Sequence, residues 1–70
     1  MKLVIVKAAH IDDCGFSYCK IGGKSATYEG QPYYEINERQ AQDFIAKNKL
    51  IPRGGDLFDE FGDICARIIK

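Results

Sequence analysis

The sequence predicts a small α+β domain in which an antiparallel sheet of three to four strands carries two C-terminal helices on one face, in the order ββββαα. Three observations lead to this fold class. Short β-branched and aromatic runs separated by glycine turns fill the first half of the chain, a capping pattern begins at Asn37, and apolar residues recur at helical spacing near the C-terminus. A chain of 70 residues can bury one core, so residues 1–70 are expected to form a single domain.

The first half of the chain contains the segments with strand character. Four short strands are expected at Lys2–Ala8, Phe16–Ile21, Ser25–Tyr28 and Pro32–Ile36. The first of these is nearly continuous in apolar residues, which is typical of a strand covered on both faces or of an inner strand of a small sheet. Gly22-Gly23 and Glu29-Gly30-Gln31 are predicted to be the turns that join the later strands, since glycine tolerates the positive φ of a tight hairpin.

The first helix is predicted from its ends. Asn37 is a favourable N-cap residue, and Gln40 follows it at the spacing of a capping box. Pro52 forbids continuation of the helix, and Leu50 and Ile51 just before it are expected to enter the core.

A second helix is predicted from Leu57 to Ile69, with Asp56 as its N-cap. Seven apolar residues would share one side of this helix, namely Leu57, Phe58, Phe61, Ile64, Cys65, Ile68 and Ile69. The acidic residues Asp56, Asp59, Glu60 and Asp63 are spaced i, i+3, i+4 and i+7, so they would form one acidic stripe. Such a stripe is either the solvated side of an amphipathic helix or a contact for a basic partner.

The charge balance and the cysteine count limit the classes of function. Ten basic and ten acidic residues cancel, so the chain has no overall field that attracts nucleic acid or an anionic membrane. The apolar run at the N-terminus is too short for a signal peptide or a membrane span. Three cysteines, an odd number, fit a reducing compartment, and a cytoplasmic protein is therefore expected.

No residue pattern in the chain predicts catalysis or a bound cofactor. His10, Cys14 and Cys19 are a loose match to zinc-ligand spacing, but the tight pair of cysteines typical of a zinc knuckle is missing. Cys65 is expected to be a small apolar core residue. His10 and Cys14 also suggest a nucleophile and base, although no orienting acid is fixed beside them. We therefore expect a protein that is not an enzyme and has no cofactor.

Direct binding to nucleic acid is disfavoured by the acidic stripe. The candidate contacts would be exposed lysines and arginine with stacking tyrosines, namely Lys20, Lys24, Lys47, Lys49 and Arg53 with Tyr18, Tyr28, Tyr33 and Tyr34. For protein binding, an aromatic anchor is expected beside the acidic stripe. Tyr33 and Tyr34 are adjacent in a predicted strand, so one of them must point away from the core.

Part of the chain follows a distinctive residue pattern, formed by Tyr28, Gly30, Glu35, Ile36, Ala41, Phe44, Ile45 and Leu50 together with the opening KLVIVKAAH. This pattern resembles that of small phage and prophage proteins. The resemblance implies a bacteriophage or mobile-element product. Small phage proteins include virion components and inhibitors of host defence, such as anti-CRISPR proteins, which are typically compact, non-enzymatic and often acidic where they meet a basic nucleoprotein complex.

These observations favour a protein-binding module that acts through Asp56, Asp59, Glu60 and Asp63 with Tyr33 or Tyr34. Together with the resemblance, they suggest a phage-encoded inhibitor of a host defence complex. The alternatives are a virion or tail component, a small zinc- or nucleic-acid-binding domain, and a module that pairs with a second copy of itself.

Overall fold

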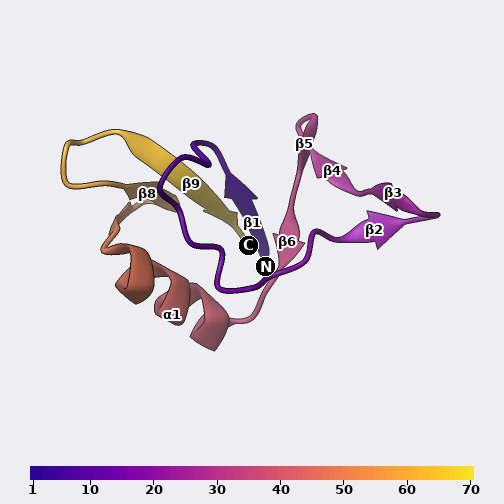
Figure 1. Cartoon of the computed structure of the whole chain (residues 1–70), viewed down its shortest axis with the longest axis horizontal. Helices are drawn as coiled ribbons and strands as arrows, with labels where there is room; N and C mark the ends of the chain where they lie inside the picture. Colours follow the sequence, from indigo (N-terminus) through magenta and orange to yellow (C-terminus); the bar gives the residue numbers. More distant parts are fainter.

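The computed structural model describes all residues 1–70 and contains one helix and nine strands. Five strands form the main sheet in the order β6-β1-β9-β8-β7, and the remaining four form two small hairpins, β2-β3 and β4-β5 (Figure 1). The elements are β1 (Lys2–Ile5), β2 (Lys20–Ile21), β3 (Lys24–Ser25), β4 (Thr27–Tyr28), β5 (Gln31–Pro32), β6 (Tyr34–Glu35), α1 (Glu38–Asn48), β7 (Ile51–Arg53), β8 (Asp56–Phe58) and β9 (Ile64–Ile69).

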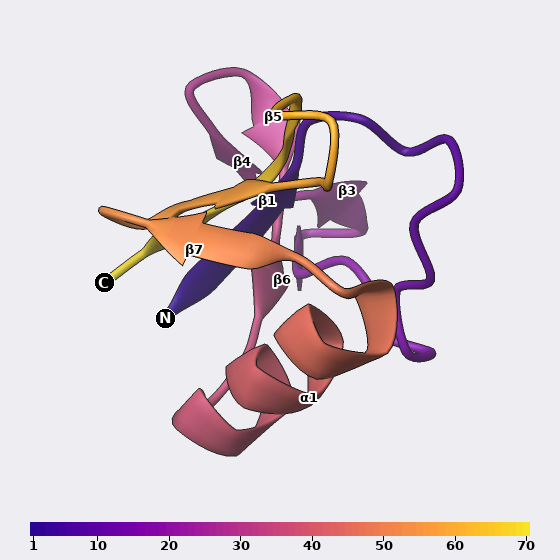
Figure 2. The same ribbon diagram turned by 90° about the vertical axis from the view of Figure 1, so that its left-hand side faces the viewer.

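Every pair of neighbouring strands in the main sheet is antiparallel. The two edge strands, β6 and β7, therefore point in the same direction. The helix α1 joins these edges by crossing one face of the sheet, as Figure 2 shows. The apolar face of the sheet is thus covered by this one helix together with the loop after β1, from which Ile11, Cys14 and Phe16 pack against the core.

The core lies between α1 and the sheet. Its buried residues come from the helix, from the strands and from the segments that flank them, namely Leu3, Tyr34, Ile36, Ala41, Phe44, Leu50, Leu57, Cys65 and Ala66. Phe44 is fully buried at its centre, facing Leu3 and Leu57, which are buried to the same degree. Burial of these large side chains provides most of the stabilisation available to so small a domain.

The predicted start and end of α1 are confirmed. The Asn37 Oδ1 atom accepts a hydrogen bond from the Gln40 amide at 2.8 Å, and the Gln40 Oε1 atom accepts one from the Asn37 amide at 2.9 Å. At the other end Lys49 adopts a left-handed conformation with φ 54°, and the Leu50 amide donates to the Ile45 carbonyl at 3.0 Å. This is the Schellman arrangement, which satisfies the last carbonyls and turns Leu50 into the core.

The prediction of a second helix over Leu57–Ile69 is wrong, and with it the ββββαα fold class. These residues form β8, a loop and β9 instead. Their apolar spacing suits both structures, but Gly62 has φ +84° and so interrupts any helix. Ile64–Ile69 is rich in β-branched residues, and its last four residues pair with β1, from Lys2 opposite Ile69 to Ile5 opposite Ala66.

The turns were better predicted than the strand lengths. Gly22 and Gly23, with φ of 60° and 80°, form the turn between β2 and β3, and Glu29-Gly30 joins β4 to β5. The expected strand over Phe16–Ile21 is shortened to its last two residues. The prediction that Ile51 enters the core is also wrong, since Ile51 lies on an edge strand and is 47% exposed.

Candidate functional site

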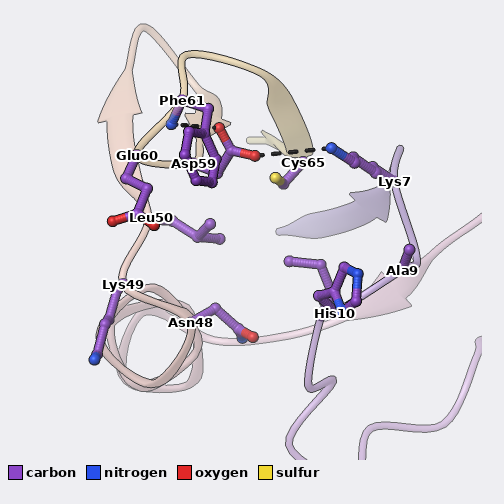
Figure 3. A pocket seen from close by; sticks show the side chains of 11 residues that line it. Lys7, Ala9, His10, Asn48, Lys49, Leu50, Asp59, Glu60, Phe61 and Cys65 are labelled. Carbon is purple, nitrogen blue, oxygen red and sulfur yellow. Dashed lines mark hydrogen bonds and ion pairs between the residues drawn. The ribbon is translucent and has the colours of Figure 1, made fainter.

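A groove of about 360 Å³ opens where the loop after β1, the C-terminal end of α1 and the β8–β9 loop meet. Leu50, Cys65 and Phe61 give it apolar walls, while Lys7 and Asp59 contribute charge at its rim (Figure 3). The groove lies at one end of the sheet and is the largest concavity of the molecule. Concave surfaces that combine apolar walls with a few charges are where binding sites usually occur.

One wall of the groove is held in place by Asn48 at the end of α1. The Asp12 amide donates to the Asn48 Oδ1 atom at 2.8 Å, and the Asn48 Nδ2 atom donates to the Asp12 carbonyl at 2.7 Å. Lys47 adds an ion pair to Asp12 at 3.1 Å. Together these contacts fix the loop between β1 and β2 against the helix.

The opposite wall is the tip loop, which we define as residues 59–63 between β8 and β9. The Asp59 Oδ1 atom accepts hydrogen bonds from the amides of Phe61 and Asp63, both at 2.9 Å. The Asp59 amide donates to the Asp63 carbonyl at 2.9 Å, and the Gly62 amide donates to the Asp59 carbonyl at 3.1 Å. The tip loop is therefore closed by its own hydrogen bonds, and Phe61 stands 82% exposed on it.

Lys7 connects the tip loop to the end of β1. Its Nζ atom lies 3.4 Å from the Asp63 carboxylate and 3.8 Å from that of Asp59. The pKa of Asp59 is lowered, first by the hydrogen bond from the Asp63 amide and then by the Phe61 amide and the Lys7 charge. Asp59 is thus an ionised residue whose carboxylate is used largely to hold the loop together.

Cys65 lies at the base of the groove, on β9. Its thiol donates weakly to the Asp63 carbonyl at 3.7 Å. Burial raises the pKa of Cys65, and the negative charge of Asp59 raises it further. A neutral thiol is a poor nucleophile, so this cysteine acts as an apolar residue of the core.

The four acidic residues of the predicted stripe do not lie together. Asp56 is on β8, where its carboxylate lies 3.4 Å from the Nε atom of Arg67. Since neighbouring strand residues point to opposite faces and Leu57 is in the core, Asp56 projects from the face away from α1. Asp59 and Asp63 pair with Lys7, and only Glu60 forms no ion pair. Three of the four acidic residues thus lie together in the tip loop, and Asp56 lies apart from them.

The two predicted tyrosine anchors lie on and beside the edge strand β6, which is separated from β8 by the two strands β1 and β9. Tyr34 is buried, donates a hydrogen bond to the Asp13 Oδ2 atom at 3.2 Å and stacks on Tyr18 at a ring separation of 4.2 Å. Its pKa is raised, chiefly by burial. Tyr33 is half-buried, with the Lys2 ammonium 5.6 Å from its ring centre. The prediction that one of the pair points away from the core holds for Tyr33, but neither tyrosine is near the tip loop.

The structure does not bring the suggested zinc ligands together. No group of three or more His, Cys, Asp or Glu side chains is arranged to hold a metal ion. Cys14 is in a turn where the Asp12 Oδ1 atom accepts its amide hydrogen bond, whereas the Cys19 amide bonds to the Tyr33 carbonyl beside β6. His10 is on the exposed loop beside the groove (Figure 3).

Sequence reasoning missed Phe61, which was assigned to the buried face of a helix. A local signal for its exposure exists in the segment Asp-Glu-Phe-Gly-Asp, because a glycine among acidic residues favours a turn.

No family model, curated protein or solved structure matches the chain. No helix of the structure combines the length and the apolar character needed to cross a membrane.

Proposed function

We propose that this chain is a non-enzymatic protein-binding module that contacts its partner through the tip loop. The observation that carries the proposal is Phe61, which is 82% exposed on a loop fixed by four hydrogen bonds. A large aromatic side chain on a rigid support loses little conformational entropy when it binds. Aromatic residues of this kind are enriched among the few that dominate the energy of protein interfaces.

The charge of the tip loop supports a partner with a basic surface. Asp59, Glu60 and Asp63 carry three negative charges, and Lys7 offsets one of them. Glu60 is exposed and unpaired, so it is the acidic side chain most free to meet a cation. Charges at the rim of an interface mainly speed association and select the partner, while the anchor provides affinity.

The finer proposal is that the partner is a host nucleoprotein complex and that the chain is a phage-encoded inhibitor of anti-CRISPR type acting in the cytoplasm. Its support is the resemblance to small phage proteins at Tyr28–Ile51, combined with an acidic, aromatic contact loop. A basic nucleic-acid-binding channel would offer the complementary charge.

The proposal is tested by affinity capture from a lysate of the host cell with matched variants. Phe61→Ser removes the proposed anchor, and Ile21→Ser is the control because it removes a similarly exposed apolar side chain from a different hairpin. We expect the specific partner to be lost with Phe61→Ser and retained with Ile21→Ser.

The loss of affinity caused by Phe61→Ser is then measured with the purified partner. Losing the burial of one phenylalanine side chain corresponds to about 2 kcal/mol, which weakens binding roughly 30-fold. Glu60→Gln should instead slow association and reduce its dependence on salt. Equal affinity of Phe61→Ser and the unchanged protein would refute the proposed contact.

A further inference from the structure

Charge is divided unevenly between the two ends of the molecule. Residues 16–28, which include the β2-β3 hairpin, contain two lysines and no acidic residue. Residues 56–63 contain four acidic residues and no basic one. In Figure 1 the β2-β3 hairpin and the tip loop lie at opposite ends of the longest dimension of the molecule, which is 37 Å.

The β2-β3 hairpin presents an apolar side chain between its two lysines. Ile21 is 72% exposed, next to the turn formed by Gly22 and Gly23. Lys20 and Lys24 are both exposed and form no ion pair within the chain. The Ala26 amide donates to the Cys19 carbonyl and closes the base of the hairpin, and the Cys19 amide donates to the Tyr33 carbonyl and attaches the hairpin to the body. The hairpin therefore projects from the body and exposes one apolar side chain and two lysines that have no partner within the chain.

The groove beside the tip loop has the complementary properties. Its volume of about 360 Å³ exceeds the ~150 Å³ that accommodates a benzene-sized group. Leu50, Cys65 and Phe61 are apolar, and Glu60 is an unpaired carboxylate at the rim. Two lysines line the groove. Lys7 is already paired with Asp59 and Asp63, and Figure 3 shows the Lys49 side chain directed away from the groove, so Glu60 is the charge left to meet an approaching cation.

We propose that the β2-β3 hairpin of one copy docks into this groove on a second copy. Ile21 would occupy the apolar space between Leu50 and Phe61, and Lys20 or Lys24 would meet Glu60. The two contacting surfaces are different, so the contact is head-to-tail and leaves a free hairpin and a free groove on every assembly. Because these lie at opposite ends of the molecule, the assembly grows as an open chain.

This self-association is weak and depends on salt. A single hairpin end in a groove buries less than the ~1,200 Å² of a typical stable interface, which places the affinity in the range of transient contacts. Its charges are exposed and therefore screened by salt. Self-association of this kind does not require the proposed partner. Where a partner does bind the tip loop, it competes with self-association.

Sedimentation velocity of the full chain at increasing concentration tests the proposal. The average mass should rise steadily with concentration at low salt and fall towards the monomer at high salt. Ile21→Ser and Phe61→Ser should each sediment as monomers. An equimolar mixture of these two variants should form a dimer that grows no further, because the first contributes only a working groove and the second only a working hairpin.

Charge reversal provides the second test, at three exposed positions where folding is not at risk. Lys20→Glu with Lys24→Glu should abolish association. Mixing this protein with a Glu60→Lys chain should restore an open, alternating assembly, because each hairpin then meets a groove of opposite charge on the other protein. A monomer at every concentration in the unchanged protein, or a mixture of Ile21→Ser and Phe61→Ser that stays monomeric, would overturn the proposal. Such a failure is separable from that of the proposed function, because loss of partner capture with Phe61→Ser but not with Ile21→Ser is expected whether or not the chain self-associates.

Discussion

Phe44 and Phe61 allow the same substitution to be made at the centre of the core and at the exposed tip. Phe44 is fully buried and packs near Phe16 at a ring separation of 6.4 Å, whereas Phe61 is 82% exposed. Replacing a buried phenylalanine with alanine costs about 3–5 kcal/mol through lost burial and the cavity left behind. A domain of 70 residues has a total free energy of unfolding of about 3.5–10 kcal/mol. Phe44→Ala is therefore expected to remove much of that total.

Urea unfolding followed by circular dichroism measures both variants. Phe61→Ala should stay within about 0.5 kcal/mol of the unchanged protein, because substitutions at exposed sites rarely do more. The slope of unfolding against urea should be the same in all three proteins, since the area exposed on unfolding hardly changes. If Phe61→Ala destabilised the domain as strongly as Phe44→Ala, Phe61 would have to be buried, and the assignment of Phe44 to the core and Phe61 to the surface would be refuted.

Three further predictions test the local structure. Gly62→Ala should destabilise the domain by about 1 kcal/mol in urea unfolding, because a φ of +84° strains alanine even though no atom lies close to its Cβ position. If Gly62 lay in a helix, the same substitution would instead stabilise the domain by a similar amount. Asn37→Ala should cost about 1 kcal/mol through loss of the capping box, and Asn37→Asp should recover most of it. The pKa values of Asp12 and Asp59 are lowered in the folded state, Asp12 mainly by the Cys14 amide and Asp59 mainly by the Asp63 amide. Both carboxylates therefore stabilise the folded state at neutral pH, and this stabilisation is lost as the pH falls through their lowered pKa values. Asp59→Asn removes one of these groups, so its urea midpoint should change less between neutral and acidic pH than that of the unchanged protein.

The helix α1 and the turns were predictable because their determinants are local. Asn37 and Gln40 are three residues apart and satisfy each other, and Gly22-Gly23 needs only its own backbone freedom. The segment from Leu57 to Ile69 was not predictable in this way, because its apolar spacing suits a helix or a bulged hairpin equally. Its structure is decided by pairing with β1, more than sixty residues away in sequence at Lys2 opposite Ile69.

The candidate site was only partly predictable for the same reason. Asp59, Glu60 and Asp63 stay together in the tip loop because they are close in sequence. Asp56 is separated from them because a strand alternates its side chains between faces, whereas a helix would have aligned all four. Phe61 was assigned to the core because helical spacing placed it beside Leu57 and Ile64, and a turn at Gly62 reverses that assignment.

Replacing the helix by a hairpin also changes what each acidic residue can contribute to binding. On a helix all the carboxylates of the stripe would be equivalent and free. In the tip loop, Asp59 accepts two amide hydrogen bonds and Asp63 pairs with Lys7, so both are engaged in holding Phe61 in place. Glu60 alone remains free to meet a partner's charge. Affinity should therefore depend on Phe61 and on the carboxylate that supports it more than on the number of negative charges, because a rigid anchor provides affinity while exposed charges mainly set the rate of encounter.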